Sequence, residues 1–594
     1  MKQEKDKELK FKKLGIDTVL ELALIIPSSY EDYRIHNSLQ DQKFQLIDAT
    51  IESVFRSANS IQITFYVHNF GYSIQGVLFK PKPYMLHQFQ VGSRDYYYGK
   101  IDCKGGHCSM SMPKRVTSIG AITPKYKCAL RSDVMFRLIE KYLSKESLLN
   151  EGVKEWVADE IINIHFAQDT VSTLEGRCLD ALKYLELYTY MQKLSAKRRY
   201  FKSIVSQKCI YDSWCKTLPF ELTQQQIKSI QDIADDFSKE VAAKRMIVGD
   251  VGSGKTMVIL AAAFMMLPHR SILMAPTTIL AKQLYEEAIK FLPNVKIILV
   301  TNKTKKIDLS AYDFIIGTHA LLYRELPQAA LVMVDEQHRF GTIQRNMLEK
   351  LVSSGKKKPH YLQFSATPIP RTQAMIESSH IDVSLITTTP FKKDIDSKVI
   401  GKEDFKKLLE HIRQEIEKQN QVLIVYPLVE QSEMMAYQSI EEARGYWEKN
   451  FKNVYITHGK DKEKEQVLED FRDNGDILIS TTVVEVGISL PRLSTVVIVG
   501  AERLGLSTLH QLRGRVSRTG LKGYCYLYTN LQKSQRLEEF TKTTSGFDIA
   551  NLDLKYRKSG DLLTGVQQSG SSFRWVDFAH DELIVQEVKK DLTS

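Results

Sequence analysis

The residues with the clearest chemistry form the loop from Gly249 to Thr256, which reads Gly-Asp-Val-Gly-Ser-Gly-Lys-Thr. This is the G-x-x-x-x-G-K-[ST] pattern, in which glycines let backbone N–H groups approach nucleotide phosphates. Lys255 then reaches the β- and γ-phosphate oxygens, and the Thr256 hydroxyl binds Mg²⁺. The sequence predicts a buried strand before the loop, and after it a helix whose positive N-terminus faces the phosphates. The predicted phosphate loop comprises Gly249, Asp250, Val251, Gly252, Ser253, Gly254, Lys255 and Thr256.

Two acidic residues follow the apolar run at 331–334. A buried parallel strand delivers such residues to its carboxyl end, where the sites of open α/β sheets lie. We expect Asp335 to bind Mg²⁺ together with Thr256, and Glu336 to orient or deprotonate the attacking water. The alternative is a strand end with ordinary surface charges. The phosphate loop elsewhere in the chain favours the catalytic interpretation.

Basic residues in the stretch Gln511 to Arg518 are the third candidate group. Arg515 and Arg518 are three residues apart, so on a helix they would share one face. From there they could stabilise the negative charge on a transferring γ-phosphoryl group, provided that a second lobe closes over ATP. The alternative is a helix with solvated arginines.

Composition sets broad limits on the class of protein. The chain has 594 residues, and Lys plus Arg (82) exceed Asp plus Glu (71), with a pI near 8.9. This excess is consistent with a polyanionic partner, although over so long a chain it is more often an ordinary solvated surface. We expect no targeting or membrane segment.

Seven scattered cysteines predict free thiols in a reducing compartment. Cys103 and Cys108 flank Lys-Gly-Gly-His, which favours a hairpin turn over a zinc site.

The elements that must position these residues fall into two blocks of alternating strands and helices from about residue 218. Each block predicts an open, mostly parallel sheet with helices on both faces. Only the first block has a phosphate loop, as in a two-lobed nucleic-acid motor. The predicted strands are 271–275, 295–300, 314–317, 331–334 and 361–364 in the first block, and 422–426, 454–457, 477–480, 496–499 and 524–528 in the second.

The N-terminal part has a different texture. Short β-branched and aromatic runs between about 44 and 116 predict a small antiparallel barrel or sandwich, for which an OB-like barrel would fit the length. Residues 9–26 have helical spacing, and 132–208 predict a helical connector. The basic end of this connector, at Lys193, Lys197, Arg198 and Arg199, is either a solvated helix face or a phosphate contact.

Several stretches occur in the order expected of superfamily 2 helicases, and the chain more narrowly resembles the RecG family of bacterial branch-migration DNA helicases. The broad resemblance lies in 222–226, the phosphate loop, 317–319, 335–338, 365–368, 481–487 and 511–518. The narrower one lies in 335–341, 366–372, 501–506 and 568–570, with 14–16, 27–32 and 164–165 outside the motor.

The resemblance implies further roles. Gln226 would read adenine, and Gln511 would belong to the catalytic set with Arg515 and Arg518. The barrel would be a wedge that splits strands at forks and four-way junctions. Phe79 and Tyr84 resemble an aromatic pair that stacks on separated bases, although two core aromatics are the alternative. Residues at positions where motor loops touch the DNA backbone are Thr277, Thr278, Thr318, His319 and Thr481.

The resemblance also implies an organisation. We expect a multidomain α/β protein with two RecA-like parallel-sheet motor lobes, preceded by an OB-like wedge and a helical connector. The expected segments are 1–40 (N-terminal helices), 41–125 (wedge), 126–215 (connector), 216–395 (lobe 1, ATP-binding), 396–545 (lobe 2) and 546–594 (C-terminal translocation element).

The function implied is an ATP-dependent, Mg²⁺-requiring DNA helicase that remodels stalled forks and Holliday junctions in recombination and repair. A bacterial cytoplasmic, nucleoid-associated monomer is expected, with single-stranded DNA-binding protein as a candidate partner. Ser489 and Gln567 depart from the family, which usually has Asp and Arg there, so coupling of hydrolysis to movement could be altered. The alternatives are a duplex-DNA translocase that displaces bound proteins, a junction-binding protein with a poorly coupled ATPase and, with least support, an RNA helicase.

Overall fold

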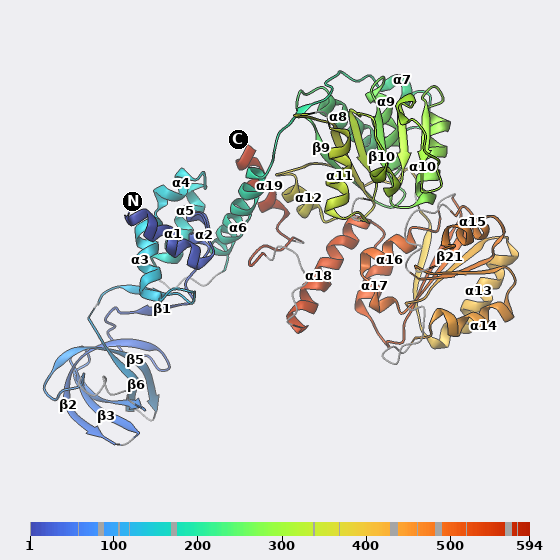
Figure 1. Ribbon diagram of the computed structural model, residues 1–594. Coiled ribbons are helices and arrows are strands. Elements are labelled where there is room, and N and C mark those ends of the chain that lie inside the picture. Colours follow the sequence, from blue (N-terminus) through green and yellow to red (C-terminus); the bar gives the residue numbers. More distant parts are fainter. Residues whose placement is uncertain are drawn as a thin grey trace. The chain divides into compact units, whose positions relative to one another are not determined.

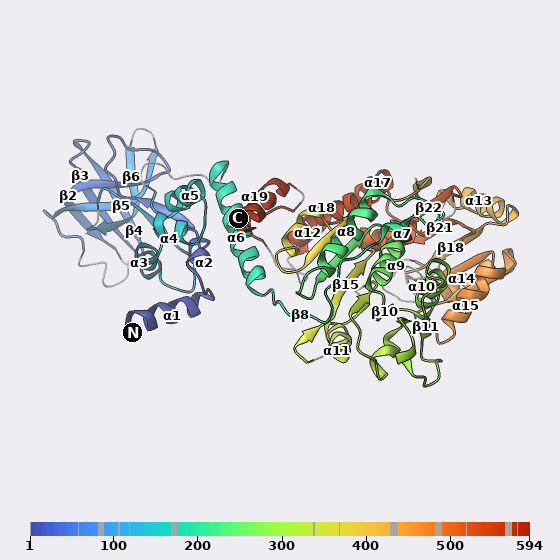
Figure 2. The ribbon, with the colours of Figure 1, turned by 90° about the horizontal axis from the view of Figure 1, so that it is seen from above.

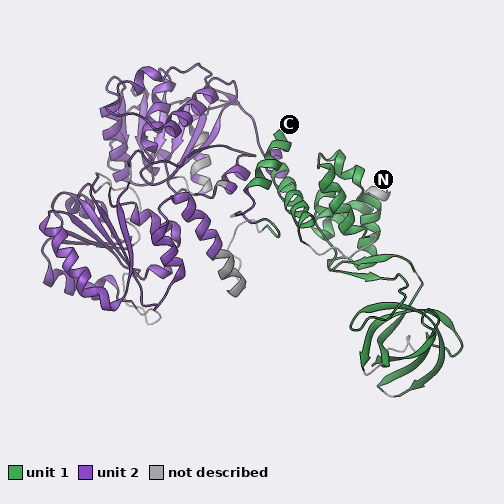
Figure 3. Cartoon of the chain, turned by 180° about the vertical axis from the view of Figure 1, so that it is seen from behind, with its two compact units in different colours: residues 1–192, 572–576, 583–594 green, residues 193–571, 577–582 purple. Residues whose placement is uncertain are grey.

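The structure, a computed structural model, divides the chain into two compact units (Figure 3). Unit 1 comprises residues 1–192, 572–576 and 583–594, and unit 2 comprises 193–571 and 577–582. The structure describes residues 2–57, 59–80, 88–104, 107–117, 119–167, 175–336, 339–353, 355–367, 369–391, 393–427, 437–459, 461–481, 490–517, 520–564, 573–578 and 580–593.

Unit 1 contains a closed five-stranded barrel in the order β2-β3-β4-β6-β5, shown in blue in Figure 1. Its pairs are antiparallel except for β4 with β6. The inner faces bury alternate residues such as Ile61, Ile63 and Phe65, as expected of strands that face a core on one side. This arrangement confirms the OB-like barrel. The strands are β2 (Phe44–Arg56), β3 (Ser60–Val67), β4 (Tyr72–Phe79), β5 (Arg94–Lys104) and β6 (His107–Val116).

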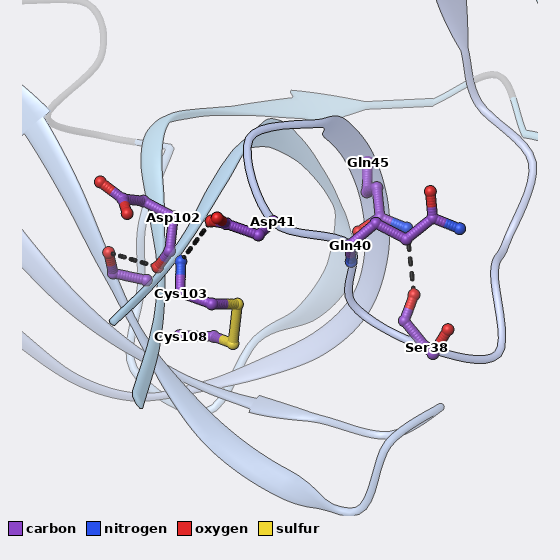
Figure 4. Close-up of a disulfide and its surroundings, with 8 residues drawn as sticks. Ser38, Gln40, Asp41, Gln45, Asp102, Cys103 and Cys108 are labelled. Atoms are coloured by element: carbon purple, nitrogen blue, oxygen red, sulfur yellow. Dashed lines mark hydrogen bonds between the residues drawn. A yellow bond between two sulfur atoms is a disulfide. The ribbon is translucent and has the colours of Figure 1, made fainter. Parts of the chain in front are cut away.

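One expectation for the barrel is wrong. Cys103 and Cys108 face each other across the β5–β6 hairpin and form a disulfide, so these two thiols are not free (Figure 4). The hairpin itself is as predicted, because direct cross-strand pairing brings the two side chains within bonding reach. Asp41 accepts a hydrogen bond from the Cys103 N–H at 2.8 Å beside the bridge. The other five cysteines form no disulfide.

The rest of unit 1 is a helical body joined by the small antiparallel pair β1 and β7. Residues 9–26 do not form one helix. The chain turns at Gly15 (φ 73°), and Thr18 starts a new helix through a capping box with Glu21. The elements are α1 (Lys2–Leu14), α2 (Val19–Ala23), β1 (Ser29–Asp32), β7 (Ile122–Lys125), α3 (Ser132–Tyr142), α4 (Lys145–Asn150), α5 (Glu155–His165), α6 (Arg177–Ala196) and α19 (Glu582–Thr593).

The C-terminal tail is divided between the units. Glu186 of α6 accepts hydrogen bonds from three successive backbone N–H groups, those of residues 574–576. Lys154 forms ion pairs with Glu587 (2.6 Å) and Asp591 (3.0 Å) of α19, and the Tyr184 hydroxyl donates to Asp591 (2.7 Å). The last helix is therefore part of the helical body of unit 1, and residues 546–594 do not form one element.

Lobe 1 of unit 2 is a seven-stranded parallel sheet in the order β11-β12-β10-β13-β15-β9-β16. Helices α8, α9 and α10 pack on one face and α11 packs on the other. The elements are α7 (Asp212–Cys215), α8 (Gln224–Phe237), β9 (Lys244–Gly249), α9 (Lys255–Met266), β10 (Ser271–Met274), α10 (Thr278–Phe291), β11 (Ile297–Val300), β12 (Phe314–Gly317), β13 (Leu331–Val334), α11 (Thr342–Val352), β15 (His360–Ser365), α12 (Arg371–Glu377) and β16 (Asp382–Ile386).

Lobe 2 is a six-stranded parallel sheet in the order β17-β22-β21-β18-β20-β19. Helices α13 and α14 cover one face, and α15, α16 and α17 cover the other (Figure 1). The elements are β17 (Ile395–Ile400), α13 (Phe405–Glu417), β18 (Gln421–Val425), α14 (Ile440–Asn450), β19 (Val454–Thr457), α15 (Lys464–Asn474), β20 (Ile477–Ser480), β21 (Leu493–Val499), α16 (Leu506–Arg513), β22 (Gly523–Tyr528), α17 (Gln535–Lys542) and α18 (Gly546–Thr564).

The two parallel sheets confirm the predicted motor lobes, and each of the ten predicted motor strands overlaps an observed one. β9 is the strand predicted before the phosphate loop, and the structure adds β16 and β17 at the edges of the two sheets. Within the described ranges, no helix is long and apolar enough to span a membrane.

Candidate nucleotide site

The phosphate loop connects β9 to α9 with two residues in the left-handed region. Gly252 and Gly254 have φ values of 77° and 75°, which glycine adopts without steric cost. A Cβ on Gly254 would lie 2.2 Å from the Gln226 amide nitrogen, so any side chain here would displace Gln226 from the loop. Lys255 is the first residue of α9, and its Nζ donates to the carbonyl oxygens of Gly249 (2.9 Å) and Asp250 (3.1 Å).

Gln226 is held against this loop. It lies in the first turn of α8, is 2% exposed, and accepts from the Thr223 N–H at 2.7 Å as part of a capping box. Its amide donates to the Ser253 carbonyl at 2.9 Å. The predicted adenine-reading residue therefore lies beside the phosphate loop with its amide hydrogen-bonded.

Asp335 and Glu336 follow β13 at the carboxyl edge of the sheet. Burial and the neighbouring Glu336 charge, opposed by Lys255, raise the pKa of Asp335 to about 7. Glu336 has a φ of 50°, an uncommon conformation for a residue with a side chain and one often associated with functional sites. Its carboxylate accepts from the Ala366 N–H at 3.2 Å, which orients it from the loop after β15.

A cavity of about 500 Å³ collects most of the predicted catalytic residues from both lobes. The phosphate loop and the two acidic residues come from lobe 1. From lobe 2 come Gln511 and Arg515, both nearly buried. The predicted site residues on its wall are Gln226, Val251, Gly252, Gly254, Lys255, Thr256, Asp335, Glu336, Gln511 and Arg515.

The expectation that Arg515 and Arg518 share one face of a helix is wrong for Arg515. Helix α16 ends at Arg513, and Arg515 lies in the turn that follows. Gly514 closes the helix against the phosphate loop, where a Cβ would lie 2.7 Å from Val251, and Ser517 has a φ of 61°. Arg518 lies outside the described residues.

The sequence did not predict the contact that joins Asp250 to lobe 2. Its carboxylate accepts from His510 Nε2 at 2.6 Å and from the Gly546 N–H at 2.9 Å. Arg513 donates to His510 Nδ1 at 3.1 Å, and because a guanidinium only donates, His510 is a neutral ring protonated at Nε2. Burial lowers the pKa of His510 despite Asp250, in agreement with this tautomer. Burial also acts to raise the pKa of Asp250, but its His510 bond and nearby charges hold that pKa below its ordinary value.

Other lining residues were also missed. Lys393 donates to the Val251 carbonyl at 2.6 Å. Phe220 and Phe391 line the same cavity, 42% and 70% exposed. Phe220 lies two residues before the Leu222-Thr223 stretch of the resemblance. That position is the feature of the sequence that could have indicated Phe220 as a residue of the nucleotide site.

The predicted DNA-contacting residues of the motor follow strands of the two sheets. Thr277 caps α10 by accepting from the Leu280 N–H at 3.3 Å, and Thr278 is the first residue of that helix. Thr318 is buried, and its hydroxyl accepts from the Ala320 N–H at 3.3 Å, whereas His319 is exposed. β10 and β12 are adjacent, so these four residues lie at one sheet edge. Thr481 follows β20 in lobe 2.

The predicted wedge pair is described only in part. Phe79 ends β4 and is 60% exposed, so it is not a core aromatic. Tyr84 lies outside the described residues, as do Ser489 and Gln567.

The donor set suits Mg²⁺. Within the described ranges, no group of three His, Cys, Asp or Glu side chains could hold a metal by itself. Mg²⁺ is normally held by one or two carboxylates together with substrate phosphates and water. A hydroxyl at Thr256 and a buried carboxylate at Asp335, both on the cavity wall, fit that pattern.

The fold and the site together define a two-lobed helicase motor. The DEAD/DEAH box helicase family matches residues 223–376, and the helicase conserved C-terminal domain matches 403–520. The chain is 44% identical to the ATP-dependent DNA helicase RecG of Helicobacter pylori strain J99, over 98% of this chain and 96% of the relative. It is 32% identical to the ATP-dependent DNA helicase RecG of Aquifex aeolicus, over 98% of this chain and 82% of the relative.

A solved structure of RecG bound to a three-way DNA junction has a TM-score of 0.55 and 28% identity to this chain. It covers 98% of this chain and 84% of that one. The chain belongs to the RecG family of ATP-dependent DNA helicases.

Proposed function

We propose that this protein is an ATP-dependent DNA helicase that remodels branched DNA, such as stalled forks and Holliday junctions, in recombination and repair. The observation that carries the proposal is the likeness to a RecG bound to a three-way DNA junction. That likeness extends over 98% of the chain, so it includes the barrel as well as the motor. A duplex translocase that only displaces bound proteins would not account for the barrel.

The nucleotide chemistry is assigned to residues on the cavity wall. Lys255 and the phosphate-loop N–H groups bind the phosphates, and Gln226 reads the base. Thr256 and Asp335 hold Mg²⁺, which neutralises phosphate charge when bound. Glu336, oriented by the Ala366 N–H, positions the attacking water. Gln511 and Arg515 approach from lobe 2, with Arg518 as a further candidate, and stabilise charge on the transferring phosphoryl group.

The DNA-contacting roles rest on the family resemblance and on exposure. Phe79, exposed at the end of β4, and Tyr84 are proposed to stack on separated bases. Thr277, Thr278, His319 and Thr481 are proposed to contact the DNA backbone. Thr318, whose hydroxyl caps a turn, would act through its backbone or through shaping the loop.

The remaining assignments are also proposals. The six segments from 1–40 to 546–594 are proposed as functional parts. In the last segment, the residues of unit 2 are proposed to serve translocation, whereas residues 572–576 and 583–594 belong to unit 1. A bacterial cytoplasmic, nucleoid-associated monomer is proposed, with single-stranded DNA-binding protein as a partner.

The test is ATP hydrolysis by the full chain with no nucleic acid, single-stranded DNA, linear duplex, a fork, a four-way junction or structured RNA. Stronger stimulation by the fork and the junction than by linear duplex supports the proposal. Equal stimulation by plain duplex would favour the translocase. Tight junction binding without stimulation would favour the poorly coupled binder.

A further inference from the structure

A basic surface lies on lobe 1, at the opposite edge of the sheet from the nucleotide site. Two basic sequence runs meet there, Lys197 to Lys202 and Lys356 to Lys358. They meet because β8 (Lys202–Ser203) pairs in parallel with β14 (Lys357–Lys358), with Lys202 opposite Lys357. In Figure 2, β8 lies at the edge of the lobe near α11, the helix that precedes β14 in the chain.

The pair borders a groove of about 550 Å³ with a strong excess of positive charge. Its wall has seven Lys and Arg side chains and two acidic ones, Asp236 and Asp382. Both acids are already engaged. Asp236 binds Arg245 (2.7 Å) and Lys239 (2.9 Å), and Asp382 binds Arg198 (2.6 Å). The other cations on the wall are Lys197, Arg199, Lys244, Lys350 and Lys358.

Four of these remaining cations carry uncompensated charge. Among the described residues, Lys197, Arg199, Lys244 and Lys350 have no carboxylate within ion-pair distance, and all four are exposed. A neighbouring titratable group responds to this charge. Burial lowers the pKa of His380, and although Glu377 opposes this, Lys244 and Arg198 lower that pKa further. The groove is therefore a preformed anion-attracting surface.

Two aromatic side chains on the wall face cations of the protein itself. The Lys358 ammonium lies 4.0 Å from the centre of the Phe201 ring, and the Arg198 guanidinium lies 5.3 Å from that of Tyr200. These contacts fix the positions of the two cations, and because an aromatic ring has no net charge they do not neutralise them. The rings therefore hold two cations at the groove wall. The features fit a sugar–phosphate backbone, which a duplex presents in regular array.

We propose that this surface, defined by Lys197, Arg199, Lys244 and Lys350, binds the phosphate backbone of a duplex DNA arm beyond the motor contacts. The proposal rests on the proposed function, because the arm belongs to a branched substrate held by the motor. Lys244 begins β9 and Gly249 ends it, so about 17 Å of strand separates this surface from the phosphate loop. The surface is thus a second DNA site, separate from the nucleotide chemistry.

The test compares fork binding by the full-length wild type and the variant Arg199→Glu/Lys244→Glu as one arm is lengthened. The arms have about one and about three helical turns, roughly 10 and 30 base pairs. The control variant Lys216→Glu/Lys228→Glu makes the same charge change at exposed lysines of lobe 1 outside the groove. Thermal unfolding of all three proteins shows whether each is folded.

We expect the wild type and the control to bind the long-armed fork more tightly than the short-armed one. The groove variant should lose that gain, and the slope of log K against log salt should become shallower by about one for each phosphate that it no longer binds. Its ATPase without DNA should equal that of the wild type. Unchanged arm-length and salt dependence in the groove variant would overturn the proposal, as would an equal loss in the control. Failure of the wild type to prefer forks over linear duplex would instead count against the proposed function.

Discussion

At the scale of single residues, Lys255 carries the nucleotide chemistry. It begins α9, and its ammonium bonds to carbonyl oxygens of its own loop. We expect Lys255→Ala to lower ATP hydrolysis by about 100-fold or more, because it removes a preorganised positive donor to the phosphates. Junction binding should stay within a few-fold, since the proposed DNA surfaces lie elsewhere. Lys216→Ala, at an exposed lysine of the same lobe, is the matched control in ATPase and binding assays. Loss of junction affinity with hydrolysis intact would contradict the site assignment.

Asp250 acts at the same scale but connects two lobes. Asp250→Asn removes the charge that accepts from His510 and from the Gly546 N–H. Because His510 is neutral, the change leaves no unpaired charge but weakens hydrogen bonds to a buried carboxylate, which are worth about 1.5–3 kcal/mol, so we expect a lower thermal midpoint and a raised KM for ATP. The exposed Asp235→Asn change on α8 is the control, with thermal unfolding and ATPase kinetics as readouts. A wild-type midpoint and KM in Asp250→Asn would show that the contact contributes nothing.

The residues of the phosphate loop and the acidic pair were predictable because short motifs combine fixed spacing with a strand on one side. His510 was not, because its role depends on a partner 260 positions away in the chain. Nor could spacing alone show that Gly514 ends α16, which depends on its contact with Val251.

At the scale of elements, His165 ties α5 to the N-terminal helices. Its Nε2 donates to the Ala23 carbonyl at 2.9 Å, and its Nδ1 accepts from the Tyr126 hydroxyl at 2.9 Å. Burial lowers the pKa of His165 to about 4. Since the unfolded pKa is about 6.5, the unfolded chain takes up a proton first, and stability is lost as the pH falls below about 6.5.

The loss attributable to His165 should reach about 2 kcal/mol between pH 7 and pH 5. This loss is measured by chemical denaturation of the full chain, with the unfolding of unit 1 followed by the fluorescence of its tryptophans or by hydrogen exchange of its amides. His165→Gln keeps one donor and one acceptor but does not titrate in this range, so it should flatten the dependence. A slope in His165→Gln equal to that of the wild type would exclude His165 as its source.

The strands were the most predictable elements, because β-branched apolar runs mark central strands of parallel sheets. Element ends were less predictable. The split of residues 9–26 into two helices depends on Gly15 and on the Thr18–Glu21 capping box. The disulfide between Cys103 and Cys108 depends on a hairpin register that composition does not reveal.

At the scale of the whole molecule, the order of parts was predictable and their assembly was not. The alternation of strands and helices indicated two lobes, and the β-rich stretch before them indicated a barrel. The return of α19 to the helical body of unit 1 depends on contacts such as Lys154 with Glu587, more than 400 positions apart. No local pattern in the polar C-terminal stretch carries that information.

The central claim is that ATP hydrolysis by this chain drives the remodelling of branched DNA. The most direct measurement is the conversion of a labelled four-way junction into its duplex products by the purified full chain, with ATP and Mg²⁺. We predict conversion with ATP, none without ATP and none by Lys255→Ala. Junction binding and junction-stimulated ATP hydrolysis by the wild type, with no conversion of the junction, would contradict the account.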